Sequence, residues 1–455
     1  MRKLSLLICV CFLTVMMAVN VQAITFSLPD GTTIYSEAAY LVNLDTDEVV
    51  YEKNADKQLV PASLTKIMTA IILLEEYKDN ISALSTTYVS GPSACFDELY
   101  MTGASTADIR IGEKVSYKDL LYAMMLRSAC EAANIIAYNI GGGSIQNFVD
   151  MMNDKAAQLG CVNTHFTNAH GLFWEDHYTT ARDMAVITEY AMSLPMFTEI
   201  SCTVEYTMEA TDYHPEPRTI SHTNYMMSRT NGGDYYYEYV KGIKTGTLDE
   251  AGRCLASLAY KDGYSYLLIT MNAPQQDAQG NNVFYNFIDA KTIYEWAFDN
   301  LEYTDIVLAT EEKAEAPVEY GDGQDYVIVR PAQAYSQIWN KSIPLSSIHQ
   351  EITLDQNVVA PVNAGDKLGT LELSYGGETL ATIDLIATQS LARSERSSMV
   401  TVAKSFIGSD DFYTALKITV GFFLAYTVLI IVLKIVVHNQ NKKRSRLYGT
   451  PKKRK

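Results

Sequence analysis

Two long apolar segments at opposite ends of the chain do most to constrain what it can fold into. At the N-terminus, Arg2 and Lys3 precede an apolar run, and the small residue Ala23 follows soon after that run ends. A basic start, an apolar core and a small residue at the cleavage site are typical of a secretory signal peptide. We therefore predict that residues 1–23 are a signal peptide cut after Ala23, with an uncleaved N-terminal anchor as the alternative.

The second apolar segment runs from Ile418 to Val437 and is followed by a basic tail. As a helix it would span about 30 Å, the hydrocarbon thickness of a bilayer. Its one charge, Lys434, lies near the end, where the side chain can reach the interface. Residues 438–455 contain eight Lys and Arg and no acid, so the positive-inside rule places them in the cytoplasm. We expect a single-pass protein of the cell membrane, with a transmembrane helix at 414–437.

The charge of the exported part argues against several classes of partner. The formal net charge of the whole chain is −17 at pH 7. Removing the +2 of residues 1–23 and the +10 of residues 414–455 leaves −29 on residues 24–413. Such a charge argues against nucleic acid as a partner and against general attraction to anionic lipid. We expect a soluble, acidic ectodomain.

Neither the cysteines nor the histidines follow the spacing of a metal site. Outside the predicted signal, five cysteines are scattered without a close pair, which fits neither a disulfide framework nor a zinc site. One disulfide could still form. Three histidines fall close together, but their spacing matches neither H-E-x-x-H nor a zinc finger, so we expect structural hydrogen bonds from them. These residues are Cys95, Cys130, Cys161, Cys202, Cys254, His165, His170 and His177.

Hydrophobic patterns divide the exported part into a mixed region and an all-β region. Residues 24–300 combine strand patterns such as EVVYEKN and YSYLLITMN with helical ones, and AKTIYEWAFDN is expected to close this region as a helix. Residues 117–140 are expected to form a helix pair or one kinked helix. Residues 301–393 alternate with period two, and Gly376-Gly377 indicates a hairpin, so we predict a small all-β domain. Residues 394–413 lack a strong period and are predicted to be a linker.

A serine and a lysine at helical spacing are the first candidates for a catalytic site. The segment PASLTKIMTA places Ser63 three residues before Lys66 at the start of an apolar run. Such positions share a helix face, with Cβ atoms about 5–6 Å apart. A lysine in an apolar setting can lose its proton near neutral pH, and a base beside a hydroxyl makes a nucleophile. The alternative is a serine near a helix start and a surface lysine.

Two further segments could complete such a site. Ser128 lies in an apolar helical context as Ser128-Ala129-Cys130, where its hydroxyl could face a cleft or simply belong to a small-residue packing surface. Lys244-Thr245-Gly246-Thr247 is predicted to lie on an edge strand, where a lysine and a hydroxyl could bind a carboxylate. Gly246 would let a substrate backbone approach closely. The alternative for this segment is an ordinary hairpin with a surface lysine.

The three candidate segments match a known set of three sequence motifs, in the same order, except at one residue. In this chain the motifs are Ser-x-x-Lys, Ser-x-Cys and Lys-Thr-Gly. Ser-x-x-Lys, Ser-x-Asn and Lys-Thr-Gly are found in β-lactamases and penicillin-binding proteins. The chain resembles the serine-type D-alanyl-D-alanine carboxypeptidases, the low-molecular-mass penicillin-binding proteins. The resemblance covers roughly residues 30–393 and includes EKVSYKDLLYAMMLRSACEAAN, GIKTGTLDEAGRCLASLA and APVNAGDKLGTLELSYGGETLATIDLIA.

The resemblance implies both a fold and an activity. The fold would be α+β and transpeptidase-like: an antiparallel sheet flanked by helices plus a helical lobe at residues 24–300, then the all-β domain and one transmembrane helix. The activity would be removal of the terminal D-alanine from peptidoglycan stem pentapeptides during cell-wall biogenesis. β-Lactam antibiotics would act as inhibitors, and no metal or organic cofactor would be needed.

The resemblance also implies residue roles. Ser63 would attack the carbonyl between two D-alanines, Lys66 would take its proton, and Ser128 would relay a proton to the leaving nitrogen. Lys244 and Thr245 would hold the terminal carboxylate. In an acyl-enzyme route of this kind, the backbone N–H groups of Ser63 and Thr247 would form the oxyanion hole.

One position departs from the family pattern. The second motif usually ends in asparagine, and here it ends in Cys130, whose thiol is a weak donor and a weak acceptor. Cys130 could merely space the two lysines, as some relatives carry cysteine there, or it could weaken turnover. Asn134, one helical turn on, could partly substitute for the missing amide.

Three alternative functions remain open from the sequence. A β-lactamase would need a residue that speeds deacylation, and Glu175 is the only nearby candidate. A non-catalytic cell-wall-binding protein is favoured only by Cys130. A D,D-endopeptidase would need a groove for a longer leaving group. The tyrosine-rich segment 235–239 either rims that groove or packs against it.

Overall fold

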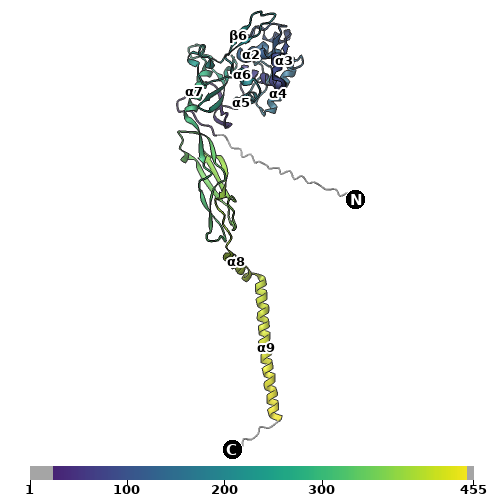
Figure 1. Ribbon diagram of the computed structural model, residues 1–455, viewed down its shortest axis with the longest axis vertical. Coiled ribbons are helices and arrows are strands. Elements are labelled where there is room, and N and C mark those ends of the chain that lie inside the picture. The colour runs from purple at the N-terminus through teal and green to yellow at the C-terminus, as the bar shows by residue number, and fades with distance from the viewer. Residues whose placement is uncertain (1–23, 448–455) are drawn as a thin grey trace, which may run out of the picture. The chain divides into compact units, whose positions relative to one another are not determined.

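The chain forms two compact units, which are described separately (Figure 1). The structure is a computed structural model that describes residues 24–447. The predicted signal peptide and residues 448–455 of the basic tail therefore lie outside the described residues. The first unit contains the described residues up to Ile306 together with Tyr335–His349 and Leu373–Ala381, and the second unit contains the rest.

A five-stranded antiparallel sheet in the order β2-β1-β9-β8-β7 forms the centre of the first unit. The Lys-Thr-Gly segment is strand β7, and it lies at one edge of the sheet, as the sequence predicted. Antiparallel pairing sets Thr245 opposite Leu255 and Thr247 opposite Arg253. The strands are β1 (Ala38–Asn43), β2 (Glu48–Lys53), β7 (Lys244–Leu248), β8 (Gly252–Lys261) and β9 (Tyr264–Ala273).

Helices cover both faces of this sheet. Leu267 and Ile269 of β9 belong to the same buried cluster as the apolar residues of α1 and α2. On the opposite face, the Tyr294 hydroxyl of α7 donates to the carbonyl oxygen of Ser257 in β8. Burial on both faces explains why β8 and β9 are almost continuously apolar rather than alternating.

A helical lobe surrounds α1, which packs against α2, α3, α4 and α5. All but the last turn of α1 is buried, so the sequence makes it apolar on every side. In Figure 1, α2, α3 and α4 lie together and apart from α7. The helices of this unit are α1 (Thr65–Tyr77), α2 (Tyr117–Leu126), α3 (Cys130–Ile140), α4 (Ile145–Gln158), α5 (Ala181–Met192), α6 (Phe197–Ser201) and α7 (Tyr285–Asn300).

Of the two alternatives for residues 117–140, the helix pair is confirmed. Helix α2 ends at Leu126 and α3 begins at Cys130. Ser128, between them, has a φ of 64°, in the left-handed region that interrupts a right-handed helix. The expectation that Ser128 lies within a helix is therefore wrong: it lies in the turn between two helices.

Short strand pairs complete the first unit. They connect β3 with β4, β5 with β6, and β10 with β13. Their bounds are β3 (Tyr88–Val89), β4 (Val115–Ser116), β5 (Glu205–Met208), β6 (Arg218–Ser221), β10 (Leu301–Val307) and β13 (Tyr335–Asn340).

The predicted small all-β domain is confirmed as a five-stranded sheet in the order β11-β12-β16-β15-β14. The predicted hairpin is the β15–β16 turn, where Gly376 and Gly377 have φ of 61° and 94°. Alternate residues such as Val327 and Val329 are buried, which matches the period-two pattern. The strands are β11 (Ala314–Pro317), β12 (Tyr326–Pro331), β14 (His349–Leu354), β15 (Lys367–Tyr375) and β16 (Glu378–Ala387).

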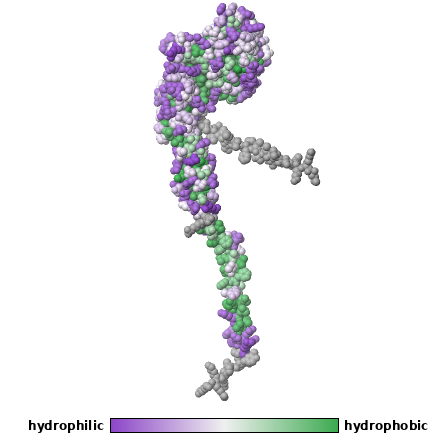
Figure 2. Space-filling view, viewed as in Figure 1, coloured by the Kyte–Doolittle hydropathy of each residue, from purple (hydrophilic) through white to green (hydrophobic). Residues whose placement is uncertain are grey.

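Two helices follow the β domain. The segment predicted to be a linker forms α8 (Glu395–Ile407), so its lack of a clear period did not indicate an irregular chain. Helix α9 (Asp410–Leu447) contains the predicted membrane span and is longer than expected. It begins earlier because the Ser409 hydroxyl accepts the N–H of Phe412, which caps the first turn. Of the described helices, one, over Asp410–Arg444, is long and apolar enough to cross a membrane, and Figure 2 shows its apolar surface.

Candidate active site

The predicted serine–lysine pair meets at the start of α1. Ser63 lies in a single 3₁₀ turn, Ala62–Leu64, and Lys66 is in the first turn of α1. The Lys66 Nζ donates to the Ser63 Oγ over 2.9 Å. A second hydrogen bond runs from the same Nζ to the carbonyl oxygen of His170. The amine is therefore fixed in position beside the hydroxyl.

The surroundings of Lys66 favour its neutral form. Its side chain is fully buried, and burial lowers the pKa of the amine below its ordinary value. The Cys130 thiol, with Sγ 3.4 Å from Nζ, and the Glu131 carboxylate partly oppose this shift. An amine with a lowered pKa that touches a hydroxyl can serve as the base that activates it.

Two glycines hold the turn that carries Ser63. Ala62 has a φ of 49°, and a Cβ on Gly171 would lie 1.9 Å from the Ala62 carbonyl oxygen. A Cβ on Gly246 would lie 3.0 Å from the Ala62 Cβ and 3.1 Å from the Ser63 nitrogen. Gly246 therefore makes room for the protein's own serine turn, and its predicted role in admitting a substrate backbone stays a prediction.

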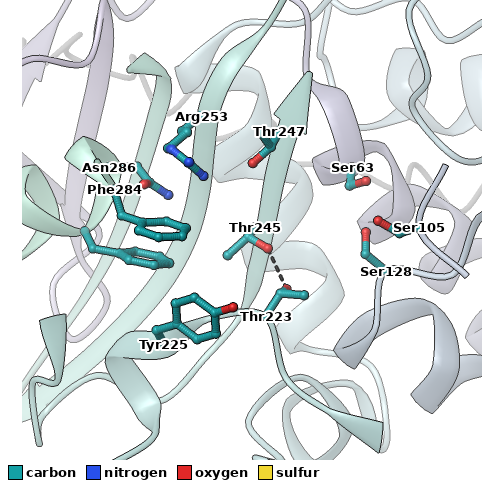
Figure 3. Close-up of a pocket in the computed structure, with 11 residues that line it drawn as sticks. Ser63, Ser105, Ser128, Thr223, Tyr225, Thr245, Thr247, Arg253, Phe284 and Asn286 are labelled. Atoms are coloured by element: carbon teal, nitrogen blue, oxygen red, sulfur yellow. Dashed lines mark hydrogen bonds between the residues drawn. The ribbon is translucent and has the colours of Figure 1, made fainter. Parts of the chain in front are cut away.

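The hydroxyls of Ser63, Ser105 and Ser128 gather at one end of a cavity of 180 Å³ (Figure 3). The left-handed conformation of Ser128 turns its side chain toward Ser63, as predicted, although from a loop. Ser105 was not predicted. It comes from an irregular segment, and its carbonyl oxygen accepts the N–H of Cys130, which ties it to the start of α3.

The Lys-Thr-Gly strand forms the middle of the same cavity. Thr245 and Thr247 line it, and the Thr245 hydroxyl bonds the Thr223 hydroxyl over 2.6 Å. Lys244 does not line it: its side chain is fully buried, and its Nζ donates to the carbonyl oxygen of Thr245. Burial and the nearby Lys66 lower the pKa of Lys244 well below its ordinary value. The structure thus does not place this amine where the predicted carboxylate contact requires it.

Arg253, which belongs to none of the three sequence motifs, supplies a cation on the cavity wall. Its guanidinium lies 4.0 Å from the Phe284 ring centroid and donates to the Val283 carbonyl oxygen and to Asn282. Arg253 is only 6% exposed, yet it forms no ion pair with any described carboxylate. The sequence alone did not indicate Arg253, because the register that sets it directly opposite Thr247, on the same face, is known only from the structure.

A second polar group on this wall has an atom without a hydrogen-bond partner among the described residues. The Oδ1 of Asn286 is buried and has no hydrogen bond among the described residues. The guanidinium, at the opposite end of the cavity from Ser63, suits a ligand with a carboxylate, whereas the Asn286 Oδ1 would accept a hydrogen bond from a donor on that ligand. The cavity therefore has a nucleophile at one end and an anion site at the other (Figure 3).

Cys130 and Asn134 do not replace the missing asparagine at the cavity. Cys130 is buried against Lys66, and it also raises the pKa of Lys244 against the effect of burial. This position fits the interpretation that it spaces the two lysines rather than its predicted role in substrate binding. The Asn134 amide donates to Glu98 and to the Cys95 carbonyl oxygen, away from the cavity.

The three clustered histidines make structural hydrogen bonds. His170 pairs with Glu98, His177 bonds the Thr65 hydroxyl, and His165 bonds the carbonyl oxygen of Asp176. Burial lowers the pKa of His177 to about 3, so it stays neutral. Within residues 24–447, no group of three or more His, Cys, Asp or Glu could hold a metal ion, and the five described cysteines are free thiols.

Of the tyrosine-rich segment, Tyr235 packs at the outer edge of the anion end. Its ring meets Phe284 and Phe287 edge to face, at centroid distances of 5.4 and 5.8 Å. Both phenylalanines line the cavity, so Tyr235 supports its wall from behind. Packing against the groove, one of the two predicted alternatives, describes this tyrosine.

Two family descriptions match the chain. The description "D-alanyl-D-alanine carboxypeptidase" matches residues 23–275, and "Penicillin-binding protein 5, C-terminal domain" matches residues 302–393. The first covers the sheet, the helical lobe and all of the candidate site except Phe284, Asn286 and Phe287. The second covers the all-β domain.

Individual relatives agree with these matches. The D-alanyl-D-alanine carboxypeptidase DacF of Bacillus subtilis is 28% identical over 375 residues, which are 82% of this chain and 89% of that protein. The crystal structure of the Streptomyces K15 DD-transpeptidase is 30% identical, with a TM-score of 0.53 over 60% of this chain and all of that one. The crystal structure of DacD from Francisella tularensis covers 81% of this chain and 96% of its own, at a TM-score of 0.60 and 23% identity. The fold class expected from the sequence is confirmed.

Proposed function

The chain belongs to the D-alanyl-D-alanine carboxypeptidase family, and on that premise we propose that it removes the terminal D-alanine from peptidoglycan stem pentapeptides through an acyl-enzyme. As a member of this family it is a serine-type peptidase. The observation that carries the proposal is the hydrogen bond from the buried Lys66 amine to the Ser63 hydroxyl, in a cavity with an unpaired cation across from it.

Acylation begins at Ser63. Lys66, whose neutral form is favoured by burial, takes the hydroxyl proton as Oγ attacks the carbonyl between the two D-alanines. The oxyanion that forms is stabilised by the backbone N–H groups of Ser63 and Thr247. Thr247 lies on the edge strand that lines the cavity, next to the turn that carries the nucleophile.

Departure of D-alanine requires a proton on its nitrogen. Ser128 lies beside Ser63 at the same end of the cavity and can pass a proton from Lys66 to that nitrogen. The C–N bond then breaks and leaves an ester on Ser63. Water attacks this ester and releases the shortened peptide, with Lys66 again available as the base.

The terminal carboxylate is bound between Thr245, in the middle of the cavity, and Arg253, at the end away from Ser63. The guanidinium has no acidic partner among the described residues, and an arginine keeps its charge at all relevant pH values. A carboxylate requirement explains why only a free C-terminus would be cut. Lys244 contributes from behind the wall by fixing the Thr245 backbone.

The same machinery accounts for inhibition by β-lactams. A β-lactam presents a reactive amide carbonyl and a carboxylate, so it can acylate Ser63 while its carboxylate binds near Arg253. A C-terminal transmembrane helix at α9 would hold the catalytic unit outside the cell membrane, beside its peptidoglycan substrate, with the basic tail in the cytoplasm.

The test is release of D-alanine from a pentapeptide that ends in two D-alanines, measured with the purified protein. Ser63→Ala should abolish both release and covalent labelling by fluorescent penicillin, whereas the exposed-serine control Ser82→Ala should retain both. Labelling that survives in Ser63→Ala would show that the nucleophile is another residue.

The outcomes also separate the rival functions. Rapid steady-state hydrolysis of nitrocefin would favour a β-lactamase, although Glu175 is exposed and does not line the cavity with Ser63. Absence of both D-alanine release and penicillin labelling would favour a non-catalytic wall-binding protein. Cleavage of cross-linked dimers in preference to pentapeptides would favour an endopeptidase.

A further inference from the structure

One end of the candidate site contains a polar group that the proposed reaction does not use. Asn286 lines the cavity and is 2% exposed, and its Oδ1 is buried without a hydrogen-bond partner among the described residues. The Nδ2 of the same side chain forms no hydrogen bond with any described residue either. Buried polar side chains in folded proteins nearly always have partners, so this amide indicates that part of a ligand pairs with it.

The start of α7 fixes the amide beside the proposed carboxylate site. Asn286 is the second residue of that helix, and Phe284 directly precedes it. The ring centroid of Phe284 lies 4.0 Å from the Arg253 guanidinium carbon. Figure 3 shows these three side chains together, at the end of the cavity away from Ser63. The amide is therefore close to the leaving residue, whose carboxylate Arg253 would bind.

A leaving D-alanine does not satisfy this amide. Its carboxylate accepts hydrogen bonds only, and the Arg253 guanidinium and the Thr245 hydroxyl already offer donors to it. The Oδ1 of Asn286 needs a donor, and the methyl side chain of D-alanine has none. With D-alanine bound, a buried polar atom stays unpaired, which costs binding free energy.

The walls around the amide favour a short, uncharged side chain. The rings of Phe284 and Phe287 stack with their centroids 5.3 Å apart, and Tyr225 meets both edge to face. All three rings line the cavity, whose 180 Å³ must also hold the scissile bond. None of the described residues that line it is acidic, so a cationic side chain would lie near Arg253 without a counter-charge. A hydroxyl is a small neutral group that can donate, and it meets these conditions.

We propose that Asn286 selects a terminal D-residue with a side-chain hydroxyl, D-serine being the smallest, over D-alanine. A hydroxyl can donate to Oδ1 or accept from Nδ2, so it pairs with whichever end of the amide faces it. The bond that breaks is the same amide: one water is consumed, and the products are the shortened peptide and D-serine. This assignment rests on the function proposed above, because it places the carboxylate of the leaving residue at Arg253.

The experiment compares three peptides that are identical except for the last residue. This residue is D-alanine, D-serine or D-α-aminobutyrate, whose ethyl group has the size of the serine side chain but no hydroxyl. We expect kcat/KM for the D-serine peptide to exceed the values for the other two by about tenfold, as one buried hydrogen bond would give. Equal values for the D-serine and D-α-aminobutyrate peptides would overturn the assignment without any variant.

Variants locate the preference at Asn286. Leucine has nearly the shape of asparagine but no polar atom, so Asn286→Leu should bring the D-serine peptide down to the level of the D-α-aminobutyrate peptide. Asn231→Leu replaces an exposed asparagine that does not line the cavity, and it should leave the advantage of D-serine unchanged. An advantage that persists in Asn286→Leu, or an equal loss for all three peptides, would show that Asn286 does not select the leaving residue.

Binding of the same peptides to the Ser63→Ala protein separates this assignment from the proposed function. Tighter binding of the D-serine peptide, with no peptide cleaved by the unaltered protein, would overturn the proposed function and leave the assignment standing. Cleavage of all three peptides with equal kcat/KM and equal binding would overturn the assignment alone. Tightest binding of the D-α-aminobutyrate peptide would also overturn it, because the aromatic walls and not the amide would then determine the preference.

Discussion

Replacement of Arg253 by glutamine tests where the substrate carboxylate binds. The guanidinium is held by the Phe284 ring, the Val283 carbonyl oxygen and Asn282, and it faces the cavity without an acidic partner among the described residues. Glutamine keeps a polar group of smaller size but removes the permanent charge. Arg253→Lys keeps a positive charge but loses the planar fork of donors, so its kcat/KM should lie between that of the unaltered protein and that of Arg253→Gln.

The magnitude follows from the kind of contact. A hydrogen bond to a charged group contributes about 1.5–3 kcal/mol, and 1.4 kcal/mol is tenfold in an equilibrium constant. Loss of the Arg253 contact should therefore lower kcat/KM about 10- to 150-fold for a carboxylate-ended peptide, mainly through KM. Thr245 remains in place, so activity should not vanish.

The assay pairs a peptide that ends in D-Ala-D-Ala with the same peptide ending in an amide. Only the first has a carboxylate to lose, so the ratio of the two kcat/KM values should collapse in Arg253→Gln. Arg229→Gln removes an equal charge from an exposed arginine that does not line the cavity, and it should leave the ratio unchanged. An equal loss for both peptides would mean that Arg253 only supports the wall, and the carboxylate site would have to be sought elsewhere.

Three further predictions concern the surroundings of the serine–lysine pair. The Cys130 thiol raises the pKa of Lys66 against the effect of burial, so Cys130→Ala should lower that pKa further. Because Lys66 acts as a base in its unprotonated form, the acidic limb of the plot of kcat/KM against pH should then move to lower pH. An acidic limb that stays in place would contradict this role of Cys130. Cys130→Asn should keep or improve turnover. Gly246→Ala should destabilise the first unit by about 1–3 kcal/mol and reduce penicillin acylation, because the new methyl meets the Ala62–Ser63 turn; unchanged thermal unfolding would show that this contact is loose.

Much of the fold follows from local patterns in the sequence. Three local patterns each identify their own element. They are the period-two alternation in β12, β15 and β16, the two glycines of the β15–β16 hairpin, and the apolar runs of β8 and β9. The break between α2 and α3 was left open, because nothing in the sequence around Ser128 forces a left-handed residue. That conformation is imposed by tertiary contacts, such as the bond from the Cys130 N–H to the Ser105 carbonyl oxygen.

The candidate site was only partly predictable, for a different reason. Ser63 and Lys66 are neighbours on one turn, so their spacing alone brings them together. Lys244 is on the expected strand. Burial of its side chain depends on which other segments pack over it, and the spacing of residues in the sequence gives no information about that packing. Arg253 became visible only once the register of the hairpin was known, since the residue opposite Thr247 depends on the length of the turn.

The charges of the site divide into two kinds with separate tasks. Lys66 and Lys244 are both fully buried, and burial lowers the pKa of each amine, which favours a neutral amine beside Ser63. An amine that must give up its proton cannot also guarantee a positive charge for the substrate carboxylate. Arg253 can, because a guanidinium is protonated throughout the physiological pH range. Placing the permanent cation at the far end of the cavity lets the protein bind an anion without raising the pKa of its base.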